Sequence, residues 1–171
     1  MWLFNAFPAE RVEQAYGFRS DQAFLDRVRL ASVRFSSGGS GAFVSGRGLM
    51  LTNHHVGREC IARLSSPDHD LEESGYLAPP DREPRCPDLD VTVLQGIKDV
   101  TAQVLDAQDP AASLADRNRS RQEMILQLEK SCSSQSGLKC TVVTLYGGGA
   151  YHLYQYKRYD DVRLVFAPET A

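Results

Sequence analysis

The sequence contains no long hydrophobic run and no excess of basic residues. Its longest apolar runs, such as residues 164–167, fall far short of the ~20 residues that span a bilayer, so no transmembrane segment is expected. The 19 Lys and Arg residues against 22 Asp and Glu give a net charge of -3, which implies no bulk attraction to nucleic acid or anionic lipid. Residues 1–8 have neither the basic n-region nor the long apolar h-region of a signal peptide. We therefore expect either a cytoplasmic protein or a chain that begins after its targeting segment.

The composition is otherwise that of an ordinary soluble globular protein, with 42% hydrophobic and 24% charged residues in a chain of 171. That length suffices for one domain with a proper core. Short runs of β-forming residues alternate with glycine turns and with helical stretches. This pattern predicts a mainly β fold with helical insertions, in which the strands form a β-barrel.

Local patterns predict where the individual elements lie. Helices are expected at 21–28, with Ser20 as N-cap, and at 113–130, with Ser113 as N-cap. A hairpin is expected where the apolar runs 41–44 and 49–52 flank a turn with two glycines. Residues 65–87 are acidic and proline-rich, which predicts a surface loop without helix or strand. Further strands are expected at 31–35, 91–94, 141–145, 151–156 and 161–166. The last of these runs almost to the end, which fits a chain cut from a longer protein.

The four cysteines, Cys60, Cys86, Cys132 and Cys140, are compatible with two disulfides and an oxidising compartment. Three pairings are possible, and the alternative is four buried free thiols. Cys132 and Cys140 bracket a turn-rich stretch that could bring them together. A bridge there would contribute roughly 2.5 kcal/mol in the chain-entropy model.

The strongest chemical signal lies in residues 48–57, where an apolar strand ends in Thr-Asn and is followed by His54 and His55. One interpretation makes a histidine of this pair the general base of a barrel-type serine peptidase, in which the imidazole is held rigidly at the mouth of the barrel and faces a serine hydroxyl. The plainer interpretation is a pair of ordinary polar residues at a strand end. A zinc site with Cys60 and Cys86 is a third one, but adjacent histidines on a strand point in different directions and no CxxC or HxxxH spacing is present. No metal and no cofactor are therefore expected.

Other segments could carry chemistry but have plainer interpretations. Ser40, between two glycines, resembles a nucleophile loop but precedes the histidines, so a flexible turn is expected. The three glycines 147–149 lack the helix and Lys-Ser or Lys-Thr of a phosphate loop and predict a hairpin turn. The tyrosines Tyr151, Tyr154, Tyr156 and Tyr159 favour packing in the barrel. Asp160 or Asp161 could orient a base histidine, although such residues more often end a turn.

Taken together, these segments resemble the bacterial dipeptidyl-peptidase 7 and 11 family of chymotrypsin-like serine peptidases. The matching pieces follow one another in the same order along almost the whole chain. They are Met1-Trp2, the Gly-Ser-Gly run with residues 43–45, and residues 48–55 (GLMLTNHH), 145–148 (LYGG), 151–154 (YHLY) and 159–169 (YDDVRLVFAPE).

The resemblance implies an exopeptidase, periplasmic or at the cell surface, that removes dipeptides from peptides with a free N-terminus. It implies a double β-barrel with a helical insertion, a homodimer, and a His-Asp-Ser triad in which the second histidine of the motif, His55, is catalytic. The triad Asp and Ser would lie beyond Ala171, so neither Asp160 nor Asp161 is the triad acid. Val56 stands where many relatives have Cys, and Cys60 is expected to serve that disulfide instead, with Cys86.

We therefore predict that residues 1–171 are one incomplete domain, the first part of a dipeptidyl-peptidase catalytic domain. The chain would supply the general base His55 and be inactive alone. Two alternatives are a non-catalytic binding module on a peptidase-like β-barrel and a small domain stabilised by zinc.

Overall fold

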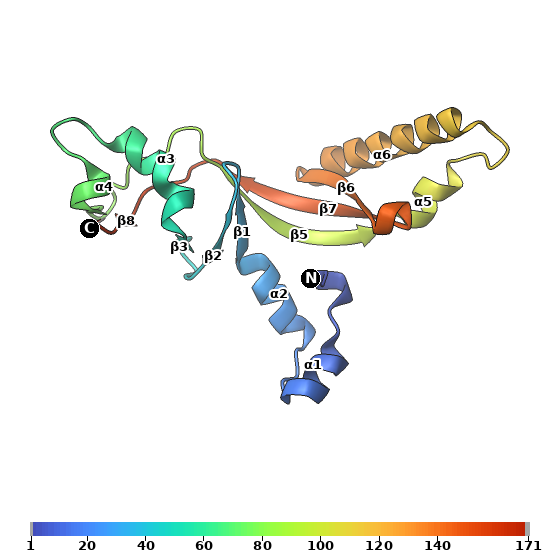
Figure 1. Cartoon of the computed structure of the whole chain (residues 1–171), viewed down its shortest axis with the longest axis horizontal. Coiled ribbons are helices and arrows are strands. Elements are labelled where there is room, and N and C mark those ends of the chain that lie inside the picture. The colour runs from blue at the N-terminus through green and yellow to red at the C-terminus, as the bar shows by residue number, and fades with distance from the viewer. Residues whose placement is uncertain (1, 170–171) are drawn as a thin grey trace. The chain divides into compact units, whose positions relative to one another are not determined.

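The computed structural model describes residues 2–169 (Figure 1). The α-helices are α1 (Ala9–Tyr16), α2 (Gln22–Ala31), α3 (His54–Leu64), α4 (Leu71–Ser74), α5 (Thr101–Asp106) and α6 (Leu114–Ser136), and short 3-10 helices lie at η1 (Phe4–Ala6) and η2 (Tyr146–Gly148). The strands are β1 (Ser32–Phe35), β2 (Ser40–Phe43), β3 (Met50–Thr52), β4 (Tyr76–Leu77), β5 (Val91–Asp99), β6 (Lys139–Leu145), β7 (Ala150–Tyr159) and β8 (Phe166–Ala167).

The main sheet has six strands in the order β3-β2-β1-β5-β7-β6, and β4 pairs separately with β8. The pairs β1/β2, β1/β5, β2/β3 and β6/β7 are antiparallel. Two expectations need correction. Helices hold more residues than strands, so the fold is mixed α/β rather than mainly β. The predicted barrel is not confirmed, because β3 and β6 lie at opposite edges of the sheet and do not pair, which leaves the sheet open.

The chain folds into two compact units, and β5 and β7 each contribute residues to both. The first unit comprises the residues up to Ser20 together with Leu94–Lys157, and the second comprises Asp21–Val93 together with the residues from Arg158 onward. The expectation of one incomplete domain over residues 1–171 stays a prediction, because compactness alone does not define a folding unit.

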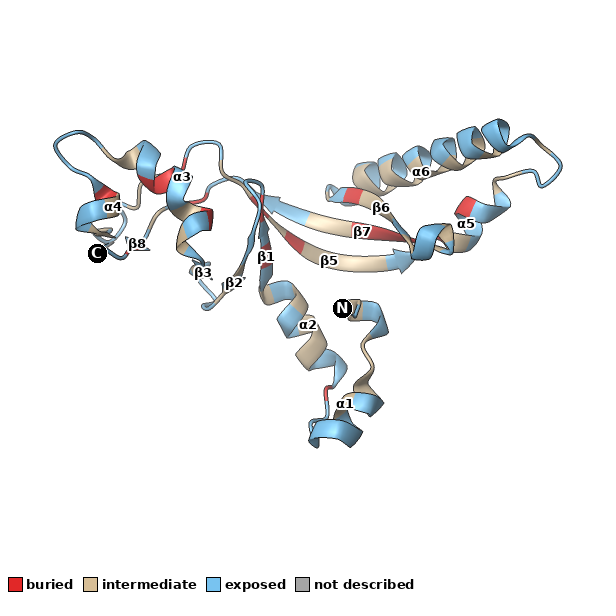
Figure 2. Ribbon diagram, viewed as in Figure 1, coloured by how far each residue is buried: buried red, intermediate tan, exposed pale blue. Residues whose placement is uncertain are grey.

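The core of the second unit forms where alternate residues of β1 and β5 point to one face. Val33 and Phe35 of β1 are buried and their neighbours are exposed, which is the period of two expected of a half-buried strand (Figure 2). They form a cluster with Val56, Val91, Val93 and Val162. A second cluster in the same unit joins Ile61, Leu71 and Ala167.

The core of the first unit lies between α6 and the strands β6 and β7. Tyr151 and Val104 are among its most buried side chains. Met124, Ile125 and Leu128 of α6 pack against this cluster, as the apolar positions of the predicted helix indicated. Glu129 and Ser133, one helical turn apart on α6, accept hydrogen bonds from backbone N–H groups of β6, those of Val142 at 2.7 Å and Cys140 at 3.3 Å. The helix therefore covers the backbone of this edge strand.

Several predicted elements are confirmed with small shifts. The hairpin pairs Ala42 with Leu51, and α6 begins after Ser113, whose hydroxyl accepts from the Asp116 N–H, but it extends to Ser136 rather than Lys130. The cap of α2 is Asp21 and not Ser20, since the Asp21 carboxylate accepts from the Phe24 N–H at 2.7 Å.

Two local predictions are wrong. Residues 65–87 contain α4 and β4, because the Asp70 carboxylate caps the helix and Leu71 is buried against α3. Residues 161–166 do not form one strand. Arg163 makes a single bridge to Arg85, which prolines at 84 and 87 flank, and proline lacks the N–H that a continuous ladder requires.

All four cysteines are bridged, as Cys60–Cys86 and Cys132–Cys140. Both expected pairings are confirmed, and the alternative of four free thiols is wrong.

Candidate functional site

The two histidines lie where β3 passes into α3. Asn53 has an extended backbone (φ -77°, ψ 150°) and stands at the N-cap, and His54 and His55 are the first two residues of the helix. The sequence placed them at the tip of a strand, just before a helical stretch, and they lie inside the first helical turn. Successive residues of a helix are rotated by about 100°, so the two imidazoles point in different directions.

Of the two histidines, His54 is the one whose imidazole contacts another side chain of the protein. Its Nε2 atom lies 3.6 Å from Oε1 of Glu72 on α4, and the same oxygen receives Nε of Arg58 at 2.8 Å. About a third of the His54 side chain is exposed (33%), and its Nδ1 atom is buried without a hydrogen-bond partner among the described residues. The His54 side chain is therefore half-buried, and it contacts α4 through Glu72.

His55 is exposed. Among residues 2–169, no hydrogen bond or ion pair engages its imidazole. An imidazole in this position can exchange a proton with a group that approaches from outside the two helices. The two histidines therefore differ in their surroundings, and the role of His55 as general base stays a prediction.

Helix α3, which carries His55, is anchored by several contacts. Val56 packs into the core against β1 and β5. Cys60 is bridged to Cys86, and Ile61 is buried in the second cluster. The hydroxyl of Ser65 closes the C-terminal end, where it donates to the Ile61 carbonyl and accepts from the Leu71 N–H at 3.0 Å. The helix is thus fixed along its length by the core, a disulfide and α4.

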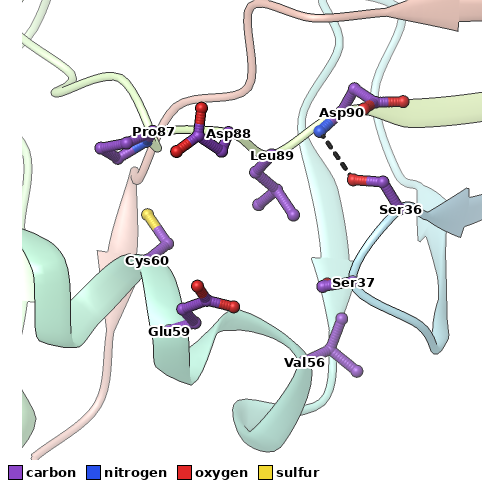
Figure 3. A pocket seen from close by; sticks show the side chains of 9 residues that line it. All are labelled: Ser36, Ser37, Val56, Glu59, Cys60, Pro87, Asp88, Leu89 and Asp90. Atoms are coloured by element: carbon purple, nitrogen blue, oxygen red, sulfur yellow. Dashed lines mark hydrogen bonds between the residues drawn. The ribbon is translucent and has the colours of Figure 1, made fainter.

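A polar cavity of about 220 Å³ lies beside α3 within the second unit (Figure 3). Its lining comes from α3, from the turn after β1 and from the segment before β5, and consists of Ser36, Ser37, Val56, Glu59, Cys60, Pro87, Asp88, Leu89 and Asp90. The acidic groups in it already have partners, since Arg63 contacts Glu59 at 2.7 Å and Asp88 at 2.8 Å. Val56 is part of this lining and His55 is not.

The other candidates from the sequence take structural places. Ser40 opens strand β2 instead of lying in a flexible turn, and its carbonyl accepts from the Thr52 hydroxyl. The glycines 147–149 form the turn between β6 and β7, as predicted. Tyr151 is buried in the first unit, and Tyr159 packs edge-on against Phe43 in the second.

The two acidic residues near the end of the chain are engaged in local contacts. Arg163 binds both carboxylate oxygens of Asp161, at 3.0 and 3.1 Å, and these bonds lower the pKa of Asp161. The Asp160 carbonyl accepts from Arg85 at 2.9 Å. Neither arrangement engages a histidine, and the expectation that neither residue is the triad acid stays a prediction.

The four residues considered as alternative zinc ligands cannot bind zinc together. Cys60 and Cys86 are joined in a disulfide, which removes the two thiolates from the group His54, His55, Cys60 and Cys86. Among residues 2–169, no group of three or more His, Cys, Asp or Glu side chains could hold a metal ion. In the same range, no helix combines the length and the apolar character needed to cross a membrane.

A second histidine–carboxylate pair lies in the first unit and was missed by the sequence analysis. His152 on β7 is buried, with Nδ1 3.4 Å from Nδ2 of Asn5 and Nε2 3.9 Å from Oδ2 of Asp99. The apolar and aromatic residues on both sides of it were the available sign of burial. His152 thus links the N-terminal segment to β5 and β7 through Asn5 and Asp99.

Three comparisons with known proteins bear on the whole chain. The family model described as Peptidase S46 matches residues 1–171. The chain is 37% identical over 140 residues to an Asp/Glu-specific dipeptidyl-peptidase of Flavobacterium psychrophilum, covering 81% of the chain and 20% of that protein. It is 31% identical over 179 residues to dipeptidyl-peptidase 7 of Porphyromonas gingivalis, covering all of the chain and 25% of that protein.

The fold is also similar to solved structures. The crystal structure of Porphyromonas endodontalis DPP11 in complex with substrate matches with a TM-score of 0.78 and 28% identity. The match covers 99% of this chain and 26% of that one. The chain therefore spans about a quarter of the proteins it resembles.

Proposed function

Because the chain belongs to the peptidase S46 family, we propose that it is the N-terminal part of a serine-type dipeptidyl-peptidase whose general base is His55. The observation that carries this proposal is the match of the family model over residues 1–171. The exposed imidazole of His55 on an anchored helix supports its assignment within the motif.

The chemistry assigned to His55 is proton transfer. The imidazole takes the proton of a serine hydroxyl as its oxygen attacks the carbonyl carbon of the peptide bond. The imidazolium then gives that proton to the nitrogen of the departing peptide, which leaves a dipeptidyl ester on the serine. A water molecule attacks this ester, with His55 again taking and returning the proton, and the dipeptide is released.

The serine and the orienting aspartate would come from the remaining three quarters of a full-length enzyme. The proposal includes the finer expectations from the sequence: substrates with a free N-terminus, a chymotrypsin-like double barrel, a homodimer, and a periplasmic or secreted location. The complexes of the related DPP11 with the dipeptides Arg-Glu and Arg-Asp support peptides as the substrate class.

The test replaces His55 by Ala in the full-length enzyme and measures dipeptide release from a fluorogenic dipeptide substrate. We expect kcat to fall by about 10⁴-fold or more, as for other bases of serine peptidase triads. The control is His69→Ala, which removes another exposed histidine of the same unit, and we expect it to keep full activity. Activity within tenfold of the parent in the His55→Ala enzyme would show that the assignment is wrong.

The 171-residue chain itself provides a second test. It lacks the nucleophile under this proposal, so no dipeptide release is expected from the purified chain. Appreciable release that His55→Ala abolishes would mean that the nucleophile lies within residues 1–171.

A further inference from the structure

Helix α3 begins without the usual side-chain cap. Asn53 stands at the N-cap, a position where Asn commonly accepts a hydrogen bond from the second or third N–H group, yet its side chain makes no such bond. Asn53 is thus joined to the first turn of α3, which carries His55, by the backbone hydrogen bond from the Val56 N–H to its carbonyl (3.0 Å) and by no side-chain bond. Val56 packs the buried side of this turn into the core, and the more exposed side depends on other contacts.

Glu72 supplies a contact of this kind. His54 and Arg58 are four residues apart and lie on one face of α3, and both reach Oε1 of Glu72, at 3.6 and 2.8 Å. The carboxylate thus joins the first turn of α3 to the second. Only 26% of the Glu72 side chain is exposed, so the contact is partly shielded from solvent.

The backbone of α4, which carries Glu72, is itself held in place. The Asp70 carboxylate accepts from the Glu72 N–H at 2.8 Å and from the Glu73 N–H at 3.3 Å, which caps α4. Leu71 is buried against Ile61 of α3. The backbone of α4 is therefore held beside α3 independently of the Glu72 side chain, and a change confined to that side chain leaves the packing of α4 in place.

We infer that Glu72 is a positioning residue for His55, acting through His54 and the first turn of α3. Holding the His54 imidazole gives that turn a second point of attachment besides Val56, and the direction in which the His55 side chain leaves the helix follows from the two. This inference rests on the proposed function, because it gives Glu72 a role through the general base. Misplacement of a catalytic group by about 1 Å can cost two orders of magnitude in rate.

The test compares Glu72→Gln with Glu73→Gln. The two variants make the same chemical change one residue apart on α4, and the Glu73 side chain is exposed. In the full-length enzyme we expect Glu72→Gln to lower kcat about tenfold with KM unchanged within twofold, and Glu73→Gln to leave both unchanged. The Arg58 side chain, the ion-pair partner of Glu72, is 66% exposed, so the pair contributes little to stability and the thermal unfolding midpoints of the two variants should agree.

A spectroscopic measurement on the 171-residue chain tests whether Glu72 restrains His55 and does not depend on enzymatic activity. We expect ¹³C relaxation of the His55 ring to show greater mobility in Glu72→Gln than in the parent, and no change in Glu73→Gln. Equal His55 mobility in all three proteins, or a kcat of Glu72→Gln within twofold of the parent, would overturn the inference. If that kcat is unchanged while His55→Ala is inactive, the positioning role fails and the proposed function stands. If His55→Ala keeps its activity, both fail.

Discussion

The disulfide Cys60–Cys86 offers a quantitative test of how α3 is held. It closes a loop with a sequence separation of 26, whereas Cys132–Cys140 closes one of 8. In the chain-entropy model these loops correspond to about 3.5 and about 2.5 kcal/mol of stabilisation. Replacing both members of a pair by Ala removes the bridge without burying a hydroxyl group. We expect the variant without Cys60–Cys86 to lose about 1 kcal/mol more than the variant without Cys132–Cys140.

The measurement is urea unfolding of the 171-residue chain, followed by backbone NMR signals in each unit. Val104 and Tyr151 report on the unit that holds Cys132–Cys140, and Val33 and Ile61 report on the unit that holds Cys60–Cys86. Each variant should lower the midpoint chiefly in its own unit. An equal or greater loss of stability on removal of Cys132–Cys140 than on removal of Cys60–Cys86 would contradict this expectation.

Two further predictions concern the hairpin and the acid range. A Cβ at Gly41 would lie 2.6 Å from the Leu51 carbonyl oxygen, so Gly41→Ala should destabilise the protein by about 1–3 kcal/mol in thermal unfolding. The control is Gly57→Ala, which has open space around its Cβ and should be neutral or stabilising. Equal unfolding midpoints of the two variants would contradict this prediction. Hydrogen bonds from Arg163 lower the pKa of Asp161 from 3.8, so the stability it contributes is present above pH 3.8 and lost as the pH falls through the lowered pKa. The midpoint difference between the parent and Asp161→Asn should therefore shrink on acidification, and a difference that grows would reverse the sign.

Elements defined by short-range patterns could be predicted from the sequence. The hairpin of β2 and β3 follows from two apolar runs around a glycine turn, and α6 follows from the Ser113 cap and its apolar face. Elements that depend on distant partners could not. Helix α4 has only four residues, and it persists because Leu71 is buried against Ile61, a contact that no local pattern contains.

The candidate site was likewise predictable only where the signal lies in neighbouring residues of the sequence. His55 could be singled out because the order of motifs around it resembles one family, and its exposure then distinguishes it from His54. Glu72 could not be found in this way. It lies eighteen residues from His54 in a segment that its prolines and acidic residues indicated to be a loop, so only the packed structure brings the two together.

The two edges of the main sheet differ in how they can associate with other chains. Hydrogen bonds from β6 to Glu129 and Ser133 occupy backbone groups that an incoming strand would need. At the other edge, β3 has three residues, and its Leu51 is exposed. Three residues are fewer than the six or seven typical of amyloid-forming segments. With β6 engaged by α6 and β3 only three residues long, neither edge of the main sheet offers a long ladder for pairing with another chain.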